Sequence, residues 1–224
     1  MKIPDRHALR YRSSAIFFLL FSLGVHAAGA DVATEGHAVT VSGRIGWEEY
    51  EKLSAILATK EISKVVFKNS GGGSLSWGLR IGKMIAEKEL TTVAEGICAS
   101  ACAIAFMGGA VREFSSEQPD SALMFHPGFE PARQLPALET KAILLEWLEA
   151  RTGQPAPADF STAMDKITKR KGGVYFLAPS HGLALKKGVS VYFCEGSEDN
   201  VSQCAGQAAA SAQQMRIVSP GQSR

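Results

Sequence analysis

The stretch KVVFKNSGGGSLSWGLRIGKMIAEK, residues 64–88, decides the fold. It begins with KVVFK (residues 64–68), a β-branched run of the kind found in buried strands. Three glycines and a serine follow, and residues 74–88 then place apolar side chains at helical spacing. A strand, a short glycine turn and a helix in this order form half of a β–α–β unit. They therefore predict a parallel sheet with crossover helices.

The same alternation continues on both sides of this stretch. Residues 37–42 (HAVTVS) alternate as a short strand does, residues 47–57 have helical periodicity, and residues 91–93 predict a third strand. Beyond them we expect a buried helix over residues 97–107, which two glycines end. The other expected strands cover residues 112–114, 122–125, 174–177 and 189–193, and the other expected helices cover residues 139–150, 159–169 and 179–187.

The N-terminus has the three parts of a secretory signal in the usual order. Four basic residues within residues 2–12 precede the apolar residues 14–25 (SAIFFLLFSLGV), and Ala28-Gly29-Ala30 matches a cleavage site. The apolar run is shorter than the roughly 20 residues of a membrane span. We therefore predict a signal peptide over residues 1–30, cut near Ala30, and a periplasmic or secreted protein. An uncleaved anchor is the alternative, and only then would the chain contact a membrane.

Composition limits the classes of partner. Residues 1–30 hold four of the 24 Lys and Arg and one of the 22 Asp and Glu, so cleavage changes the net charge from +2 to −1. A balanced chain without a basic stripe predicts no nucleic-acid partner. The length suits one domain, expected over residues 31–204. Residues 205–224 are rich in Ala, Gln and Ser, and we expect them to form a disordered tail.

Four cysteines, an even number, suit disulfide bonds in an exported chain. Three complete pairings are open, and we favour the local pairs, Cys98 with Cys102 and Cys194 with Cys204. For the first pair, two reduced core residues are the alternative, because positions i and i+4 of a regular helix give poor disulfide geometry. No second Cys or His pair stands at zinc-site spacing, so no metal is predicted.

Three features supply the parts that acyl transfer by a serine requires: a hydroxyl, a base and donors for the oxyanion. The glycine loop, residues 69–74 (NSGGGS), lets backbone N–H groups approach a ligand, although its spacing is neither a P-loop nor a dinucleotide fingerprint. Ser100 stands between two alanines, and a helix N-terminus there would favour negative charge. His126 ends an apolar strand directly before Pro127-Gly128. Each feature taken alone also suits a structural role.

The order of these pieces resembles the Clp protease proteolytic subunit family, within the larger crotonase-like superfamily. The similar pieces are NSGGGS (69–74), GICASACAIAFMGGA (96–110) and ALMFHPG (122–128), and the resemblance extends over residues 65–189. It implies an α/β fold with repeated β-β-α units and a mostly parallel sheet flanked by helices.

The resemblance also implies roles for individual residues. Ser100 would be the nucleophile and His126 the general base, with the backbone N–H groups of Gly72 and Ala101 as oxyanion donors. The loop residues that would hold an extended substrate are Gly71, Gly73 and Ser74. We therefore predict an exported serine hydrolase, a peptidase for unfolded or short peptides that acts on a peptide or protein substrate without a cofactor. No ATPase partner is expected outside the inner membrane, whereas the family's rings suggest a homo-oligomer.

One departure from the family concerns the third member of its catalytic triad. The family has an Asp at or next to the position of Val174 in KGGVYF (171–176). Losing the carboxylate that orients the histidine costs such a site about four orders of magnitude in turnover. Asp159, Asp165, a backbone carbonyl or another polar side chain are the candidates to replace it. The main alternative is therefore a catalytically idle binding or scaffold protein on the same fold.

Two other hypotheses keep the same fold. A crotonase-like acyl-thioester enzyme would use the oxyanion loop without Ser100, but an exported protein meets little coenzyme A. A Ser–Lys dyad would use Lys83, on the helix after the glycine loop. The position of His126 fits a Ser–His site better.

Overall fold

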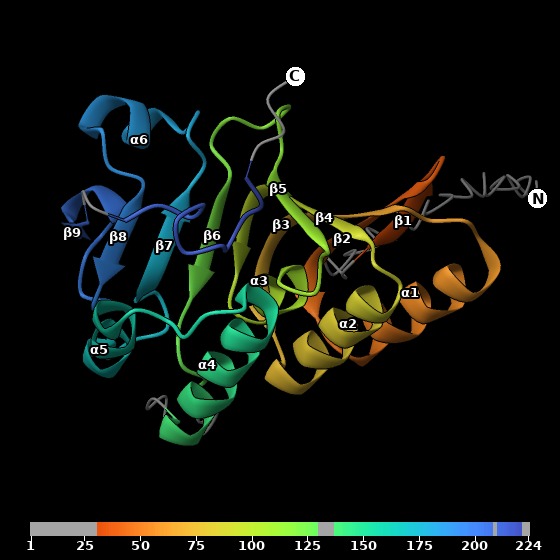
Figure 1. The fold of residues 1–224 in the computed structure, drawn as a ribbon, viewed down its shortest axis with the longest axis horizontal. Helices are drawn as coiled ribbons and strands as arrows, with labels where there is room; N and C mark the ends of the chain where they lie inside the picture. The colour runs from red at the N-terminus through yellow and green to blue at the C-terminus, as the bar shows by residue number, and fades with distance from the viewer. Residues whose placement is uncertain (1–30, 130–136, 208–209, 221–224) are drawn as a thin grey trace, which may run out of the picture.

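The structure, a computed structural model, describes residues 31–129, 137–207 and 210–220 (Figure 1). Its strands form one sheet in the order β1-β2-β3-β4-β6-β7-β8-β9, and β5 pairs with β4. The strands are β1 (Val32–Glu35), β2 (Ala38–Ile45), β3 (Lys64–Gly73), β4 (Thr91–Ala99), β5 (Val111–Phe114), β6 (Ala122–Phe125), β7 (Gly173–Leu177), β8 (Val191–Cys194) and β9 (Ala205–Gly206).

The sheet is parallel in its centre and antiparallel at both ends. Strands β2, β3, β4 and β6 are parallel neighbours, and β5 also lies parallel to β4. Strand β1 pairs antiparallel with β2, and the β6–β7–β8–β9 side is antiparallel throughout. The predicted α/β class with crossover helices is confirmed, although the parallel part makes up only the middle of the sheet.

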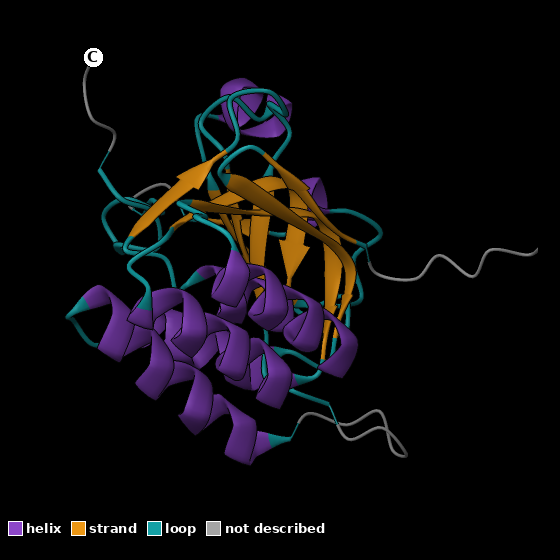
Figure 2. Cartoon of the chain, turned by 90° about the vertical axis from the view of Figure 1, so that its right-hand side faces the viewer, coloured by secondary structure: helices purple, strands orange, loops and turns teal. Residues whose placement is uncertain are grey.

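The helices gather mainly on one face of the sheet (Figure 2). They are α1 (Trp47–Thr59), α2 (Leu75–Glu87), α3 (Ala101–Phe106), α4 (Leu138–Thr152), α5 (Ala158–Lys166) and α6 (Gly182–Lys187), with a 3₁₀ turn at Val201–Gln203. Helix α2 packs against α3 through glycines: a Cβ on Gly78 would lie 2.5 Å from the carbonyl oxygen of Ala101, and a Cβ on Gly82 would lie 3.1 Å from that of Ile104. This close contact fixes α3, and with it the turn before α3.

Helix α4 buries its apolar stripe in its own domain. Leu144 and Leu148 are fully buried in the main core, and Trp147 donates its ring N–H to the carbonyl oxygen of Ile104 at 2.9 Å. Ile143 belongs to the same apolar stripe, but its side chain is exposed. The amphipathic pattern of this segment is therefore explained by packing within the chain.

The buried helix expected over residues 97–107 is only half a helix. Strand β4 continues through Ala99, and α3 begins at Ala101. The end of β4 pairs on both sides, Cys98 with Ser70 of β3 and Ile97 with Ala122 of β6. A short run of small apolar residues suits a buried strand as well as a buried helix, and here the available neighbours decide for the strand.

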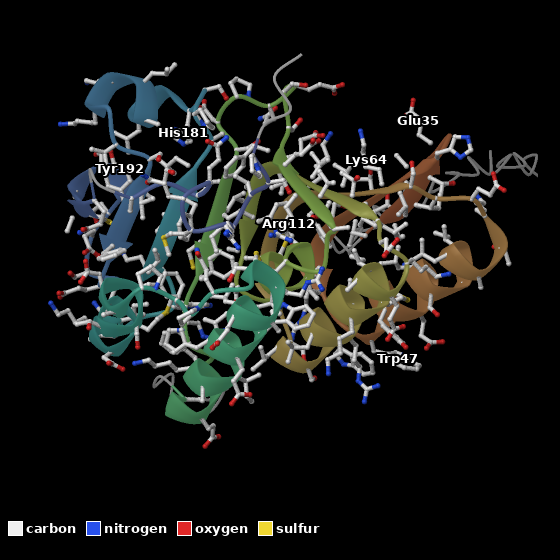
Figure 3. The ribbon with its side chains drawn as sticks, viewed as in Figure 1. Glu35, Trp47, Lys64, Arg112, His181 and Tyr192 are labelled. Atoms are coloured by element: carbon white, nitrogen blue, oxygen red, sulfur yellow. A yellow bond between two sulfur atoms is a disulfide. The ribbon has the colours of Figure 1, made fainter. Side chains whose placement is uncertain are left out.

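The C-terminal segment differs from the expected disordered tail. Within residues 210–220, Ala212, Ile217 and Val218 are buried in the main core. The buried Arg112, labelled in Figure 3, holds this segment by donating to the carbonyl oxygens of Ile217 and Arg216 at 3.0 and 2.8 Å. The domain therefore extends beyond the predicted boundary at residue 204.

The predicted signal peptide, residues 1–30, lies outside the described residues. Among the helices that are described, not one has the length and apolar character needed to cross a membrane. The same part of the chain holds no group of three or more His, Cys, Asp or Glu side chains suited to a metal ion.

Candidate active site

Three neighbouring strands bend together close to one edge of the sheet. Gly43 of β2, Asn69 of β3 and Gly96 of β4 have positive φ angles of 75°, 48° and 68°. The ladder registers between these strands shift at the same level. The φ of Gly96 favours glycine, and an added Cβ there would also have to displace Asn69 Oδ1, 2.0 Å away. Bulges of this kind re-aim the ends of strands near functional sites, and here they direct the glycine loop and Ser100 toward the same edge.

A buried serine stabilises the bend. Ser70 is fully buried, donates its hydroxyl to the carbonyl oxygen of Gly43 and accepts a hydrogen bond from the N–H of Gly72 at 3.2 Å. One hydroxyl thereby bonds to a backbone group of each of the two strands at the bend. The oxyanion donor predicted at Gly72 thus has an internal partner in the free site.

Ser100 occupies the sharp turn between β4 and α3. Its backbone angles, φ 56° and ψ −124°, lie in a region that residues with a side chain rarely adopt. The turn is held by a hydrogen bond from the Ser100 N–H to the carbonyl oxygen of Met124 at 2.8 Å. Backbone strain of this kind persists where the surrounding structure enforces it, and such positions cluster at functional sites.

A disulfide spans the Ser100 turn. Cys98 lies near the end of β4, Cys102 lies in the first turn of α3, and their Cα atoms are 5.3 Å apart. Because the chain turns between them, the two cysteines do not share a regular helix, which removes the geometric objection to this bond. Cys194 and Cys204 form the second bond. Both local pairings are confirmed, and disulfides are typical of oxidising compartments.

His126 follows β6, the parallel neighbour of β4, so it ends up beside the Ser100 turn. The residue is partly exposed, but its Nδ1 is buried and has no hydrogen-bond partner among the described residues. Burial, and to a smaller extent the positive charge of Arg170, lower the pKa of His126 to about 4. The imidazole is therefore neutral at neutral pH and free to accept a proton.

The residues predicted to form the site meet in one cavity of about 750 Å³. It is lined by Gly71, Gly72, Gly73, Ser74, Ser100 and His126. Ala101, the predicted second oxyanion donor, directly follows Ser100 and is buried at the first position of α3. The predicted residues therefore lie together, whatever their roles.

No carboxylate orients His126 within the described part of the chain. Val174 is fully buried in β7 opposite Phe125. Asp165 forms an ion pair with Lys141 at 2.6 Å, and Asp159 lines a different cavity. Neither substitute that the sequence suggested reaches the histidine. The lysine of the alternative dyad, Lys83, is exposed on α2 and is not part of the cavity wall.

Other residues of the cavity had no signal in the sequence. Arg44, directly after the bend in β2, and Arg170, in the segment before β7, both line it. Thr140 of α4 accepts a hydrogen bond from the Gly128 N–H at 2.6 Å and so fixes the segment after His126. The Phe129 ring lies beside the imidazole, with 5.2 Å between the ring centroids. An isolated arginine or threonine in a polar segment points to no particular site, so only the fold could identify them.

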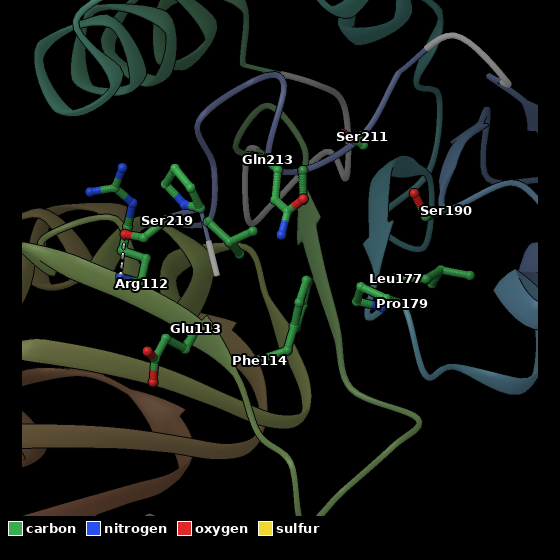
Figure 4. A pocket seen from close by; sticks show the side chains of 12 residues that line it. Arg112, Glu113, Phe114, Leu177, Pro179, Ser190, Ser211, Gln213 and Ser219 are labelled. Atoms are coloured by element: carbon green, nitrogen blue, oxygen red, sulfur yellow. Dashed lines mark hydrogen bonds between the residues drawn. The ribbon is translucent and has the colours of Figure 1, made fainter. Parts of the chain in front are cut away.

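A second cavity, of about 460 Å³, lies between β5 and the C-terminal segment (Figure 4). Ser219 accepts a hydrogen bond from the backbone N–H of Arg112 at 3.0 Å on its wall, and Glu113 and Phe114 are also part of its lining. Its lining includes no His or Cys. The hydrolytic candidate remains the cavity at Ser100, because that cavity combines a serine in a strained turn with a histidine and the glycine loop.

Neither a family model nor a curated protein matches this chain. Solved structures are similar over part of it. ClpP1 from Listeria monocytogenes has 23% identity and a TM-score of 0.44, covering 58% of this chain and 79% of its own. The ClpP protease catalytic domain from Plasmodium falciparum has 20% identity and a TM-score of 0.44, covering 65% and 81%. Methylmalonyl-CoA decarboxylase complexed with 2S-carboxypropyl-CoA has 14% identity and a TM-score of 0.36, covering 51% and 55%.

These similarities are low in identity, and their TM-scores lie below 0.5. They assign no role to any residue of the cavity. The chemistry of the site therefore has to be judged from the geometry of Ser100, His126 and the glycine loop.

Proposed function

We propose that this chain is an exported serine hydrolase, a peptidase that cleaves short or unfolded peptides through Ser100 and His126. The observation that best supports this proposal is that Ser100 and His126 lie at the same edge of the sheet. Ser100 lies in a strained turn after β4, His126 follows the parallel neighbour β6, and the Ser100 N–H bonds to Met124, two residues before the histidine. Both side chains line the cavity that contains the glycine loop.

The proposed reaction begins when Ser100 Oγ attacks the carbonyl carbon of the scissile bond. His126 accepts the hydroxyl proton, and the electron pair of the C=O bond moves to the oxygen. Collapse of this intermediate breaks the C–N bond, and the leaving amine takes the proton from His126. Water then attacks the acyl-serine with His126 as base, the ester C–O bond breaks, and the proton returns to Ser100.

Two backbone groups are proposed to stabilise the oxyanion. The Ala101 N–H belongs to the first turn of α3, where N–H groups have no partner inside the helix. The Gly72 N–H donates to Ser70 Oγ in the free site and would exchange this long bond for one to the charged oxygen. A Cβ on Gly72 would lie 2.9 Å from the Ala101 nitrogen, so the two donors are close neighbours.

The proposed site is a dyad and is expected to be slow. With Nδ1 buried and unpartnered among the described residues, no group fixes the tautomer of His126 or stabilises its protonated form. A triad that loses its carboxylate retains about one part in 10⁴ of its turnover. Formation of the acyl-serine is therefore expected to be easier to detect than repeated turnover.

The same orphaned nitrogen favours a second candidate function. A binding or scaffold protein on this fold would keep the cavity and the glycine loop without needing an oriented base. A pKa of about 4 makes His126 a weak base, which also suits an idle site. Reaction of Ser100 with an electrophile separates the two candidates, because an idle serine does not react.

We propose an oxidising compartment for this activity, on the basis of the predicted signal peptide and the two disulfides. In an oxidising compartment outside the inner membrane, ATP is not available, so we propose hydrolysis without an ATPase. The substrate would have to reach the cavity already unfolded or as a short peptide. A homo-oligomer remains part of this proposal, and sedimentation of the purified protein tests it.

Turnover of a panel of fluorogenic short peptides and peptide esters tests the proposed activity. We expect slow hydrolysis that is the same with and without ATP, that is faster for esters than for amides, and that the Ser100→Ala variant lacks. Equal rates for the wild type and Ser100→Ala would reject the proposal. The exposed Ser116→Ala variant controls for the effect of removing a serine hydroxyl outside the cavity.

A further inference from the structure

The charged groups on the described wall of the Ser100 cavity all have the same sign. Arg44 and Arg170 line it, no Asp or Glu side chain does, and His126 is neutral at neutral pH. Both arginines are exposed, and none of the ion pairs within the described residues includes either of them. The guanidinium groups are thus available to an incoming ligand.

The two arginines flank the reacting groups on opposite sides. In sheet order, Arg44 belongs to β2, the glycine loop to β3, Ser100 follows β4, His126 follows β6, and Arg170 precedes the antiparallel β7. All five therefore reach the same edge of the sheet. Arg170 is close enough to His126 for its charge to contribute to the lowered pKa of the imidazole.

We infer that the cavity selects substrates with carboxylates on either side of the scissile bond, so that the substrate class is an acidic peptide. Arg170 lies on the His126 side, near enough for its charge to act on the imidazole, and Arg44 belongs to β2, two strands from β4. Neighbouring strands lie about 4.8 Å apart, which puts the Arg44 backbone about 10 Å from the strand that ends before Ser100. An extended chain covers that distance in about three residues. Guanidinium groups pair well with carboxylates, often through two parallel hydrogen bonds.

This inference rests on the proposed function, because the bound peptide is a substrate only if the site hydrolyses it. The test of binding does not require hydrolysis. The Ser100→Ala variant, which cannot form an acyl-serine, is titrated into a fluorescent ten-residue peptide. The peptide carries one Glu about three residues before its centre and one about three residues after it. The matched peptides replace Glu by Gln, and each is made with a free and an amidated C-terminus. Fluorescence anisotropy gives the dissociation constants at low and at high salt.

We expect the Glu peptide to bind about tenfold more tightly than the Gln peptide at low salt, because two exposed pairs contribute about threefold each. The preference should shrink at high salt, which screens exposed charges. In the Ser100→Ala protein, adding either Arg44→Gln or Arg170→Gln should reduce the preference for the Glu peptide about threefold. Adding both should abolish this preference. Binding of the Gln peptide should not change.

The matched control is Arg80→Gln, because Arg80 is also exposed but lies over the Trp77 ring on α2, outside the cavity lining. Affinity that falls on changing Glu to Gln in both the free and the amidated peptides would identify acidic side chains and support the inference. Affinity that falls only on amidation, with the Glu and Gln peptides equal, would identify the C-terminal carboxylate instead and would overturn it. Equal affinity for the Glu and Gln peptides, no measurable binding of either, or a preference that survives the double arginine variant would overturn it.

The failure of this inference and that of the proposed function are distinguishable. A neutral fluorophosphonate tests the reactivity of Ser100 and does not involve the arginines. Reactive Ser100 without a preference for acidic peptides would reject the inference alone. A preference that depends on Arg44 and Arg170 beside an unreactive Ser100 would keep the acidic ligand class and reject hydrolysis.

Discussion

Gly72 and Ser100 are in direct contact at the carboxyl edge of the parallel strands. A Cβ on Gly72 would lie 2.7 Å from Ser100 Cβ and 2.5 Å from the carbonyl oxygen of Ala99, and Gly72 has a φ of +91°. Only glycine combines this backbone angle with this approach. The contact places a backbone N–H beside the serine, and it connects the glycine loop to the strained turn.

The variant Gly72→Ala should therefore lose activity. The added methyl group would collide with the Ser100 turn and displace an oxyanion donor, the loss of which typically costs about 10²- to 10³-fold in kcat. The matched control is Gly182→Ala outside the cavity lining, because a Cβ on Gly182 meets only Asp120 Oδ1, at the ordinary contact distance of 3.7 Å. Peptide ester hydrolysis by the two variants provides the measurement. Similar rates for both would contradict the role given to Gly72.

The variant Ser70→Ala should destabilise the domain. Removing this buried hydroxyl leaves the carbonyl oxygen of Gly43 and the N–H of Gly72 without their partner. An unsatisfied buried polar group costs about 1–3 kcal/mol. Chemical denaturation compared with the exposed Ser116→Ala gives the difference in free energy of unfolding. A loss below about 0.5 kcal/mol, the usual range for surface changes, would show that the bend does not depend on Ser70.

The two disulfides should differ in what they support. The chain-entropy model assigns about 2 kcal/mol to the short Cys98–Cys102 loop and about 3 kcal/mol to the Cys194–Cys204 loop. Replacing Cys194 and Cys204 by alanine should thus lower the free energy of unfolding more. Replacing Cys98 and Cys102 should reduce the reactivity of Ser100 more, because that bond spans its turn. Melting curves and probe-labelling rates of the two double variants test this contrast, and the same order in both measurements would contradict it.

The pH dependence of Ser100 labelling should report the state of His126. The histidine acts as a base only when neutral, and its pKa is lowered to about 4. The rate should therefore stay level as the pH falls through 6.5, the ordinary value for histidine, and decline with a midpoint near 4. The Arg170→Gln variant should raise this midpoint, because it removes one cause of the lowered pKa. A wild-type midpoint near 6.5 would contradict the burial of the ring.

Much of the fold could be predicted where the sequence changes its period clearly. Residues 64–88 pass from a β-branched run through glycines to a helical pattern, and the structure has β3 and α2 there. The run from Ile97 to Met107 could not be divided correctly, because it is small and apolar throughout. The packing of Ile217 and Val218 depends on Arg112, a hundred residues earlier in the chain, and no local pattern reports such a contact.

The candidate site was predictable to the extent that it lies in ordered motifs. Ser100 and His126 come together because each follows a parallel strand. The sequence predicted the strand before His126, over residues 122–125, but placed Ser100 within a helix over residues 97–107. Among the described residues no carboxylate bonds to His126 Nδ1, as the resemblance implied from Val174. By contrast, the bend through Gly43, Asn69 and Gly96 arises only when three strands are aligned. The arginines that flank the cavity depend on that alignment too, which explains why sequence patterns did not indicate them.

The hydrolytic site is tested most directly by the rate at which a fluorophosphonate probe labels the purified protein and the variants Ser100→Ala and His126→Ala. Mass spectrometry of the labelled peptide locates the modified atom. We expect labelling of Ser100 in the wild type and none in Ser100→Ala. Labelling in His126→Ala should be at least a hundredfold slower, since general-base assistance contributes about 10²- to 10⁴-fold. A folded wild-type protein that does not react, or that reacts equally without His126, would contradict a hydrolytic site and leave a binding protein.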